Sequence, residues 1–122
     1  MFSSGVDNED VNIITKSVLK DRLENDVDIF VIDVREPHEV LQTGEIGVNI
    51  PLGDIASGAL GLSPEDFEYE YGVKKPETSF DVAFVCKAGV RSCFAAKIAR
   101  DAHGYSRVLN YSGGADEWFR LG

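Results

Sequence analysis

The sequence predicts an α/β domain built on an open, mainly parallel five-stranded sheet with helices on both faces. Short apolar runs rich in β-branched residues alternate with longer segments of helical periodicity, which is the pattern of successive β-α units. Right-handed crossovers between parallel strands then place the helices on the two faces of the sheet. A chain of 122 residues suits one hydrophobic core. We therefore expect one domain over residues 11–122, preceded by a flexible segment at residues 1–10.

The first half of the chain begins with an apolar run, Val11–Ile14, followed by Thr15, a good helix N-cap. The predicted first helix turns a face of Val18, Leu19, Arg22 and Leu23 to one side and ends near Asn25 and Asp26. The continuous run Ile29–Ile32 is typical of a strand covered on both faces. A second helix is expected from Pro37, since proline suits the first helical turn, and should end just before Gly44.

The middle of the chain predicts a short edge strand at Val48–Ile50 and loose helical turns at 52–58. Ser63 and Pro64 form a strong helix start, so a helix is expected up to Tyr71, with Gly72 as its stop. Its inner face should carry Phe67 and Tyr71, which we interpret as core contacts rather than a ligand site.

The last part of the chain predicts a strand at Val82–Val85, a helix from Val90 to about His103 and a final strand at Val108–Tyr111. A short helix should follow Gly113 and Gly114. The long helix should end at Gly104, a typical C-terminal cap. Its inward stripe is predicted to consist of Val90, Phe94, Ile98 and Ala102, and Cys93 is expected on the inner side as a packing residue.

Composition and charge exclude several classes of partner. Twelve basic against twenty-one acidic side chains give a net charge of −9, which repels nucleic acids and anionic membranes, so neither is expected. No apolar run approaches the roughly 20 residues of a membrane span. The N-terminal residues lack a signal or transit pattern, which predicts an intracellular protein of the cytoplasm or the mitochondrial matrix with two free thiols. The histidines lack ligand spacing, so no metal or other cofactor is expected, and oligomeric state stays open.

The segment with the clearest chemistry is the loop between the Val82–Val85 strand and the following helix, with the sequence Cys-Lys-Ala-Gly-Val-Arg-Ser. A buried parallel strand that ends at Cys86 places its sulfur at the carboxyl edge of the sheet, where open α/β folds bind ligands. Backbone N–H groups of the loop and the helix N-terminus favour an anion and lower the pKa of a thiol. Cys86 is the candidate nucleophile. The candidate substrate-binding residues are Lys87, Ala88, Gly89, Val90, Arg91 and Ser92.

Two further segments join this loop in resembling a known family. The loop from Cys86 to Arg91 resembles the six-residue active-site loop of single-domain rhodaneses, the thiosulfate sulfurtransferases. The segment 33–39, Asp-Val-Arg-Glu-Pro-His-Glu, is similar to a second signature of that family, and the glycine pair before Trp118 is similar to its C-terminal turn. The segment 44–51 is two residues shorter than the family pattern and has Glu45 in place of histidine, so its turn should differ.

The resemblance implies transfer of sulfane sulfur from thiosulfate or a persulfide to cyanide or a thiol, through a persulfide on Cys86. It implies a small anionic sulfur donor as partner, and supporting roles for Asp33 and Arg35 at the sheet edge. Two alternatives from other classes stay open. A Cdc25-like phosphatase or arsenate reductase has a loop one residue longer, and a non-catalytic interaction module of this fold usually lacks the loop cysteine. For Cys86 itself, the alternative to a nucleophile is a buried structural cysteine, since free cysteine is often buried.

Overall fold

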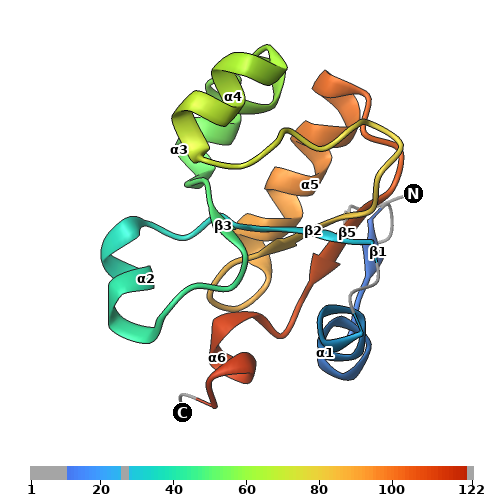
Figure 1. Ribbon diagram of the computed structural model, residues 1–122. Coiled ribbons are helices and arrows are strands. Elements are labelled where there is room, and N and C mark those ends of the chain that lie inside the picture. The colour runs from blue at the N-terminus through green and yellow to red at the C-terminus, as the bar shows by residue number, and fades with distance from the viewer. Residues whose placement is uncertain (1–10, 26–27, 121–122) are drawn as a thin grey trace, which may run out of the picture.

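The fold of the chain is a five-stranded sheet between two layers of helices (Figure 1). The computed structural model describes residues 11–25 and 28–120, so the expected flexible segment at 1–10 lies outside the described residues. The strand order is β1-β5-β4-β2-β3, and every neighbouring pair is parallel. The strands are β1 (Asn12–Ile13), β2 (Phe30–Asp33), β3 (Val48–Asn49), β4 (Val82–Val85) and β5 (Val108–Tyr111). The predicted fold class and the edge position of β3 are therefore confirmed.

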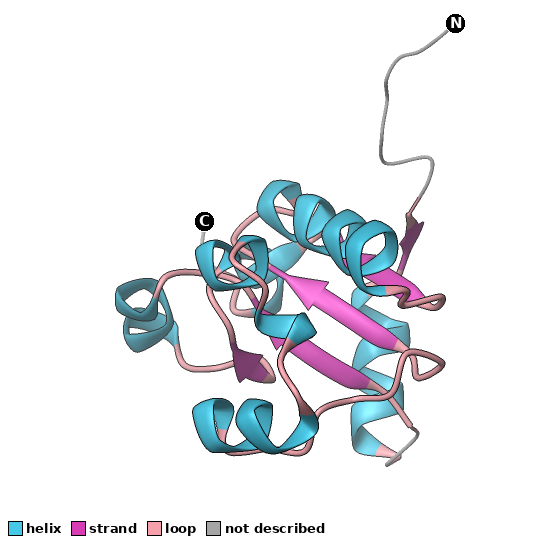
Figure 2. Ribbon diagram, turned by 90° about the horizontal axis from the view of Figure 1, so that it is seen from above, coloured by secondary structure: helices cyan, strands magenta, loops and turns pink. Residues whose placement is uncertain are grey.

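The helices cover both faces, as Figures 1 and 2 show. The two faces follow from the alternation of side chains along each strand. Ile32, Phe84 and Val108 pack on one side with α5, α3 and α4, while Val31, Val85 and Tyr111 pack on the other side with α1 and α6. The helical elements are α1 (Lys16–Glu24), α2 (Pro37–Thr43), α3 (Leu52–Ala56), the 3-10 turn η2 (Ala59–Gly61), α4 (Pro64–Tyr71), α5 (Val90–His103) and α6 (Gly114–Trp118).

Local signals in the sequence account for most helix ends. The Thr15 hydroxyl accepts the N–H of Val18 at the start of α1, and Ser63 caps α4 in the same way through Asp66. Gly72 ends α4 in the left-handed conformation with φ +75°, which glycine adopts without steric cost. In α1, however, Leu19 is fully buried whereas Val18 and Leu23 are exposed, so the expected apolar face is narrower than predicted.

The predicted inward stripe of α5 is wrong. Val90 and Phe94 are 66% and 56% exposed, Ala102 is exposed, and Ile98 is half-buried. The buried face consists instead of Ser92, Cys93, Ala95, Ala96 and Ala99. Helical periodicity fits either face, and α5 lies against β4, β5 and α3. Small side chains allow this close approach, so the helix buries them and leaves the larger residues at its surface. The inner position of Cys93 is confirmed.

Strand register positions the candidate site. Asp33, Val85 and Tyr111 are aligned as neighbours across β2, β4 and β5. The residues that follow these three positions therefore emerge together at the carboxyl edge of the sheet. Cys86 follows the central strand β4, and Ser112 follows β5. The edge of a parallel sheet thus brings together loops that are far apart in the chain.

Candidate functional site

Cys86 lies at the end of β4 with its thiol enclosed by the loop that follows. The side chain is 1% exposed, and its Sγ accepts the backbone N–H of Gly89 at 3.0 Å. The Ser92 Oγ lies 3.3 Å from the same sulfur. The 14-residue helix α5 begins at Val90, so its positive N-terminal end also faces the loop. The arrangement suits a negatively charged sulfur.

The environment of Cys86 lowers the pKa of its thiol. Burial raises the pKa, but hydrogen bonding with the Ser92 side chain and with the backbone N–H groups of Ser92, Ala88 and Gly89 lowers it by more. The net result is a pKa below that of a free cysteine, which increases the fraction present as nucleophilic thiolate. The lowering comes from hydrogen bonds within the loop, and the backbone N–H groups among these donors are ones that the sequence also indicated.

The two basic residues of the loop each contact a carboxylate. Both terminal nitrogens of Arg91 bind Glu39 of α2, at 2.7 and 2.9 Å, and Lys87 lies 3.0 Å from Asp116 of α6. Arg91 holds the pKa of Glu39 at about 2, so this carboxylate is ionised at neutral pH. An anion reaches either cation only by sharing it with its carboxylate. Glu39 and Asp116 are thus residues of the site that sequence reasoning missed, although Glu39 lies within the 33–39 segment.

Two glycines let neighbouring segments approach the loop closely. Gly89 has φ +93°, and a β-carbon there would lie 2.5 Å from the Ser112 carbonyl oxygen. Gly114 has φ +64°, and a β-carbon there would overlap the carbonyl group of Lys87. At the start of α6 the N–H groups of Ala115 and Asp116 donate to the Cys86 and Lys87 carbonyls, at 2.8 and 3.1 Å. The turn after β5 therefore holds the backbone of the Cys86 loop from one side.

Asp33 and Arg35 form a buried ion pair next to the site. They are 0% and 2% exposed, and the closest nitrogen–oxygen distance is 2.7 Å. The guanidinium of Arg35 also donates to the Thr43 hydroxyl and the Gly44 carbonyl, at 2.9 and 3.0 Å. Arg35 therefore ties the end of β2 to the end of α2, the helix that carries Glu39. This geometry suits the supporting role expected for the pair.

A polar residue inside β5 completes the site. Asn110 is 1% exposed and contacts both Ser92 and Gly89. We did not single it out from the sequence. The sequence signal that could have identified it is an asparagine within an otherwise apolar strand, because a buried amide requires hydrogen-bond partners.

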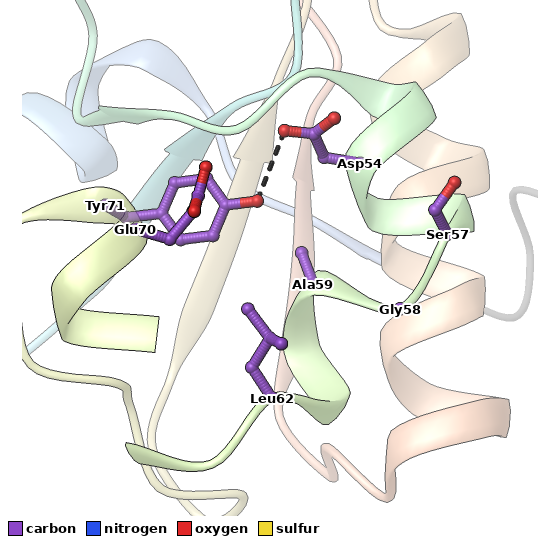
Figure 3. A pocket seen from close by; sticks show the side chains of 7 residues that line it. All are labelled: Asp54, Ser57, Gly58, Ala59, Leu62, Glu70 and Tyr71. Carbon is purple, nitrogen blue, oxygen red and sulfur yellow. Dashed lines mark hydrogen bonds between the residues drawn. The ribbon is translucent and has the colours of Figure 1, made fainter. Parts of the chain in front are cut away.

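A hollow elsewhere on the surface has different chemistry. It measures about 270 Å³, contains no residue of the Cys86 loop and is lined by Asp54, Ser57, Gly58, Ala59, Leu62, Glu70 and Tyr71 (Figure 3). The Tyr71 hydroxyl donates to Asp54 at 3.2 Å, and burial together with Asp54 raises the pKa of Tyr71 to about 12. The carboxylates here disfavour an anionic ligand. Within the described residues no group of three or more His, Cys, Asp and Glu side chains could hold a metal ion.

The chain is similar in sequence and in fold to known proteins. The family model for the rhodanese-like domain matches residues 15–121. A Drosophila melanogaster protein, rhodanese domain-containing protein CG4456, is 42% identical over 77% of this chain and 85% of its own length. The thiosulfate:glutathione sulfurtransferase of Saccharomyces cerevisiae is 32% identical over 81% of this chain and 70% of its own length. The structure of the human single-domain sulfurtransferase TSTD1 superposes with a TM-score of 0.82 at 28% identity, covering 92% of this chain and 98% of the human chain.

Proposed function

The chain belongs to the rhodanese-like domain family, and on that premise we propose that it is a thiosulfate sulfurtransferase with Cys86 as its nucleophile. The observation that carries the proposal is the position of the Cys86 sulfur, which ends the central strand and accepts the Gly89 N–H at 3.0 Å. A thiolate held by backbone donors attacks sulfur without a neighbouring base. Similar proteins whose names contain the word sulfurtransferase support the same reaction class, the transfer of sulfur.

The proposed reaction has two half-reactions. The Cys86 thiolate attacks the outer sulfur of thiosulfate, a new S–S bond forms, and the S–S bond within thiosulfate breaks as sulfite leaves with its electron pair. The product is a Cys86 persulfide whose terminal sulfur carries the negative charge. Cyanide or a thiolate then attacks that terminal sulfur and leaves with it, so that the Cys86 thiolate is regenerated. Neither half-reaction requires a proton transfer, and Cys86 needs only donors that stabilise negative sulfur.

The contacts of the loop indicate which residues stabilise the Cys86 thiolate and which bind the sulfur donor. The backbone N–H groups of Ala88, Gly89 and Ser92 stabilise the attacking and the regenerated thiolate. Val90 and the exposed parts of Lys87 and Arg91 face solvent at the start of α5, where the charged end of the donor is proposed to lie. We propose a thiol acceptor inside the cell, where a reducing environment keeps the Cys86 thiol reduced. In the described part of the chain, no helix is long and apolar enough to span a bilayer.

The test measures intact-protein mass after treatment with thiosulfate and removal of the excess. The wild-type chain should gain one sulfur atom and lose it to cyanide as thiocyanate. Cys86→Ser should abolish the gain, because a hydroxyl is not ionised near neutral pH and is a poor nucleophile toward sulfur. Cys93→Ser is the matched control, since it changes the other buried thiol and should retain most of the activity. Equal loss in both variants would contradict the assignment of the nucleophile.

An aryl phosphate serves as a counter-test for the phosphatase alternative. The loop has four residues between Cys86 and Arg91, which leaves less room than a tetrahedral phosphate needs for three oxygens that each meet a donor. The wild-type chain should show no meaningful hydrolysis. Phosphatase turnover that Cys86→Ser removes would overturn the proposed reaction.

A further inference from the structure

Four groups around Cys86 form a closed ring of hydrogen bonds. The Cys86 Sγ lies 3.3 Å from the Ser92 Oγ, which lies 2.6 Å from the Asn110 Oδ1. The Asn110 Nδ2 donates to the Gly89 carbonyl at 3.1 Å, and the Gly89 N–H donates back to the Cys86 Sγ at 3.0 Å. Cys86, Ser92 and Asn110 are each no more than 1% exposed. Little water is therefore available to replace any of these bonds.

The direction of each bond in the ring follows from the chemistry of its atoms. A carbonyl oxygen only accepts, so the Asn110 side chain must turn its NH₂ group toward Gly89. The Oδ1 of Asn110 then faces Ser92, and because this oxygen also only accepts, the single hydroxyl proton of Ser92 points at it. Ser92 therefore turns its lone pairs toward Cys86. That arrangement suits a thiol, which donates its S–H to the Ser92 Oγ.

We propose that Asn110 is a positioning residue that controls the ionisation of Cys86 by holding the hydroxyl proton of Ser92. This proposal rests on the proposed function, in which Cys86 reacts as a thiolate. When Cys86 loses its proton to water, the Ser92 lone pairs face a negative sulfur. The hydroxyl must rotate toward the sulfur to donate, and that rotation leaves the Asn110 Oδ1 buried without its partner, which is unfavourable. Asn110 thus opposes the thiolate, whereas the backbone N–H groups favour it.

The other charged groups around the loop do not take part in the ring. Four elements contribute them: the end of β2, α2, the Cys86 loop itself and α6. Each cation among them binds a carboxylate within 3.0 Å. The groups are Asp33, Arg35, Glu36, Glu39, Lys87, Arg91 and Asp116. Replacement of a neutral amide in β5 leaves their charges unchanged, so a shift in the ionisation of Cys86 reports on the ring.

The test follows the ultraviolet absorbance of the thiolate against pH in the full chain with Cys93→Ser, which leaves Cys86 as the sole thiol. A Cys86→Ser version of the same protein supplies the tyrosine background. The perturbation is Asn110→Leu, which removes the acceptor at similar volume. The Ser92 hydroxyl is then free to donate to the sulfur. At pH values below the midpoint of the thiol titration, the thiolate fraction should rise about 3- to 10-fold. An unchanged or lower thiolate fraction would overturn the proposal. A general loosening of the loop would weaken the hydrogen bonds from the backbone to the sulfur and lower the thiolate fraction, so loosening does not produce the expected rise.

Two further variants and a matched control keep the test decisive. Adding Ser92→Ala to Asn110→Leu should abolish the rise, and a rise that persists would contradict a route through Ser92. Ser92→Ala alone removes the hydroxyl whose hydrogen bond lowers the pKa of Cys86, but because Asn110 holds its proton, the thiolate fraction should fall by less than Asn110→Leu raises it. A larger fall would contradict the proposal, because Ser92 would then donate freely to the sulfur in the wild type. Asn49→Leu is the matched control, since Asn49 bridges the Asp33 and Arg35 carbonyls at 2.9 Å and has no place in the ring. Absorbance needs no sulfur donor, so failure of the proposed function would appear separately in the mass assay.

Discussion

Removal of the Arg35 charge should destabilise the domain more than removal of any exposed charge. The replacement Arg35→Met keeps the length of the side chain but leaves the Asp33 carboxylate, 0% exposed, without its partner at 2.7 Å. It also removes the donors to Thr43 and Gly44. Breaking a buried ion pair in this way costs about 3–5 kcal/mol. For a chain of 122 residues, 1 kcal/mol corresponds to about 4 °C in Tm, so the expected decrease is about 12–20 °C.

Thermal and urea unfolding at neutral pH measure this effect. The double variant Asp33→Asn with Arg35→Met should recover most of the lost stability, because no buried charge then lacks a partner. The control is Lys87→Met, which breaks the exposed pair with Asp116, whose side chains are 62% and 35% exposed. Such pairs contribute about 0–1 kcal/mol. If Arg35→Met lowers Tm no more than Lys87→Met does, the reasoning about the buried pair is refuted.

Three other predictions concern the site. The pKa of Glu39, lowered from 4.5 to about 2 by Arg91, means that its stabilising contribution is present above pH 4.5 and is lost as pH falls toward 2. The free energies of unfolding of the wild type and of Glu39→Gln, measured by urea unfolding against pH, should differ by about 1 kcal/mol near neutrality and converge in acid; a difference independent of pH would contradict this. Gly89→Ala should abolish most sulfur transfer, because the added β-carbon meets Ser112. Gly72→Ala is the control: this glycine is also left-handed but has open space around it, so the replacement should cost only about 1–2 kcal/mol of stability and keep activity. Equal sulfur-transfer activities of the two variants would argue against the close approach at Gly89. Arg91→Ala should lower kcat/KM for thiosulfate about 10-fold or more, with Lys87→Ala smaller, and unchanged kinetics in both would assign these residues to the solvated surface.

The sequence by itself determined the elements and the position of the candidate nucleophile. Apolar runs and capping residues are local signals, so β4, α4 and the end of α5 at Gly104 could be placed without knowledge of the packing. The rule that parallel strands present their carboxyl ends at one edge then placed Cys86 there. These inferences need only short-range geometry and one topological rule.

Only the tertiary structure decided which partners the side chains of the site have. Arg91 and Glu39 are 52 residues apart, and Ser92 and Asn110 are 18 apart, so neither pair follows from local spacing. The buried face of α5 was likewise undecidable from periodicity, because its large and small residues both form stripes. Contact with the sheet selected the small ones. Hydrogen bonds and close packing depend on positions within a few tenths of an ångström, and those positions exist only once β4, β5, α2 and α5 are assembled.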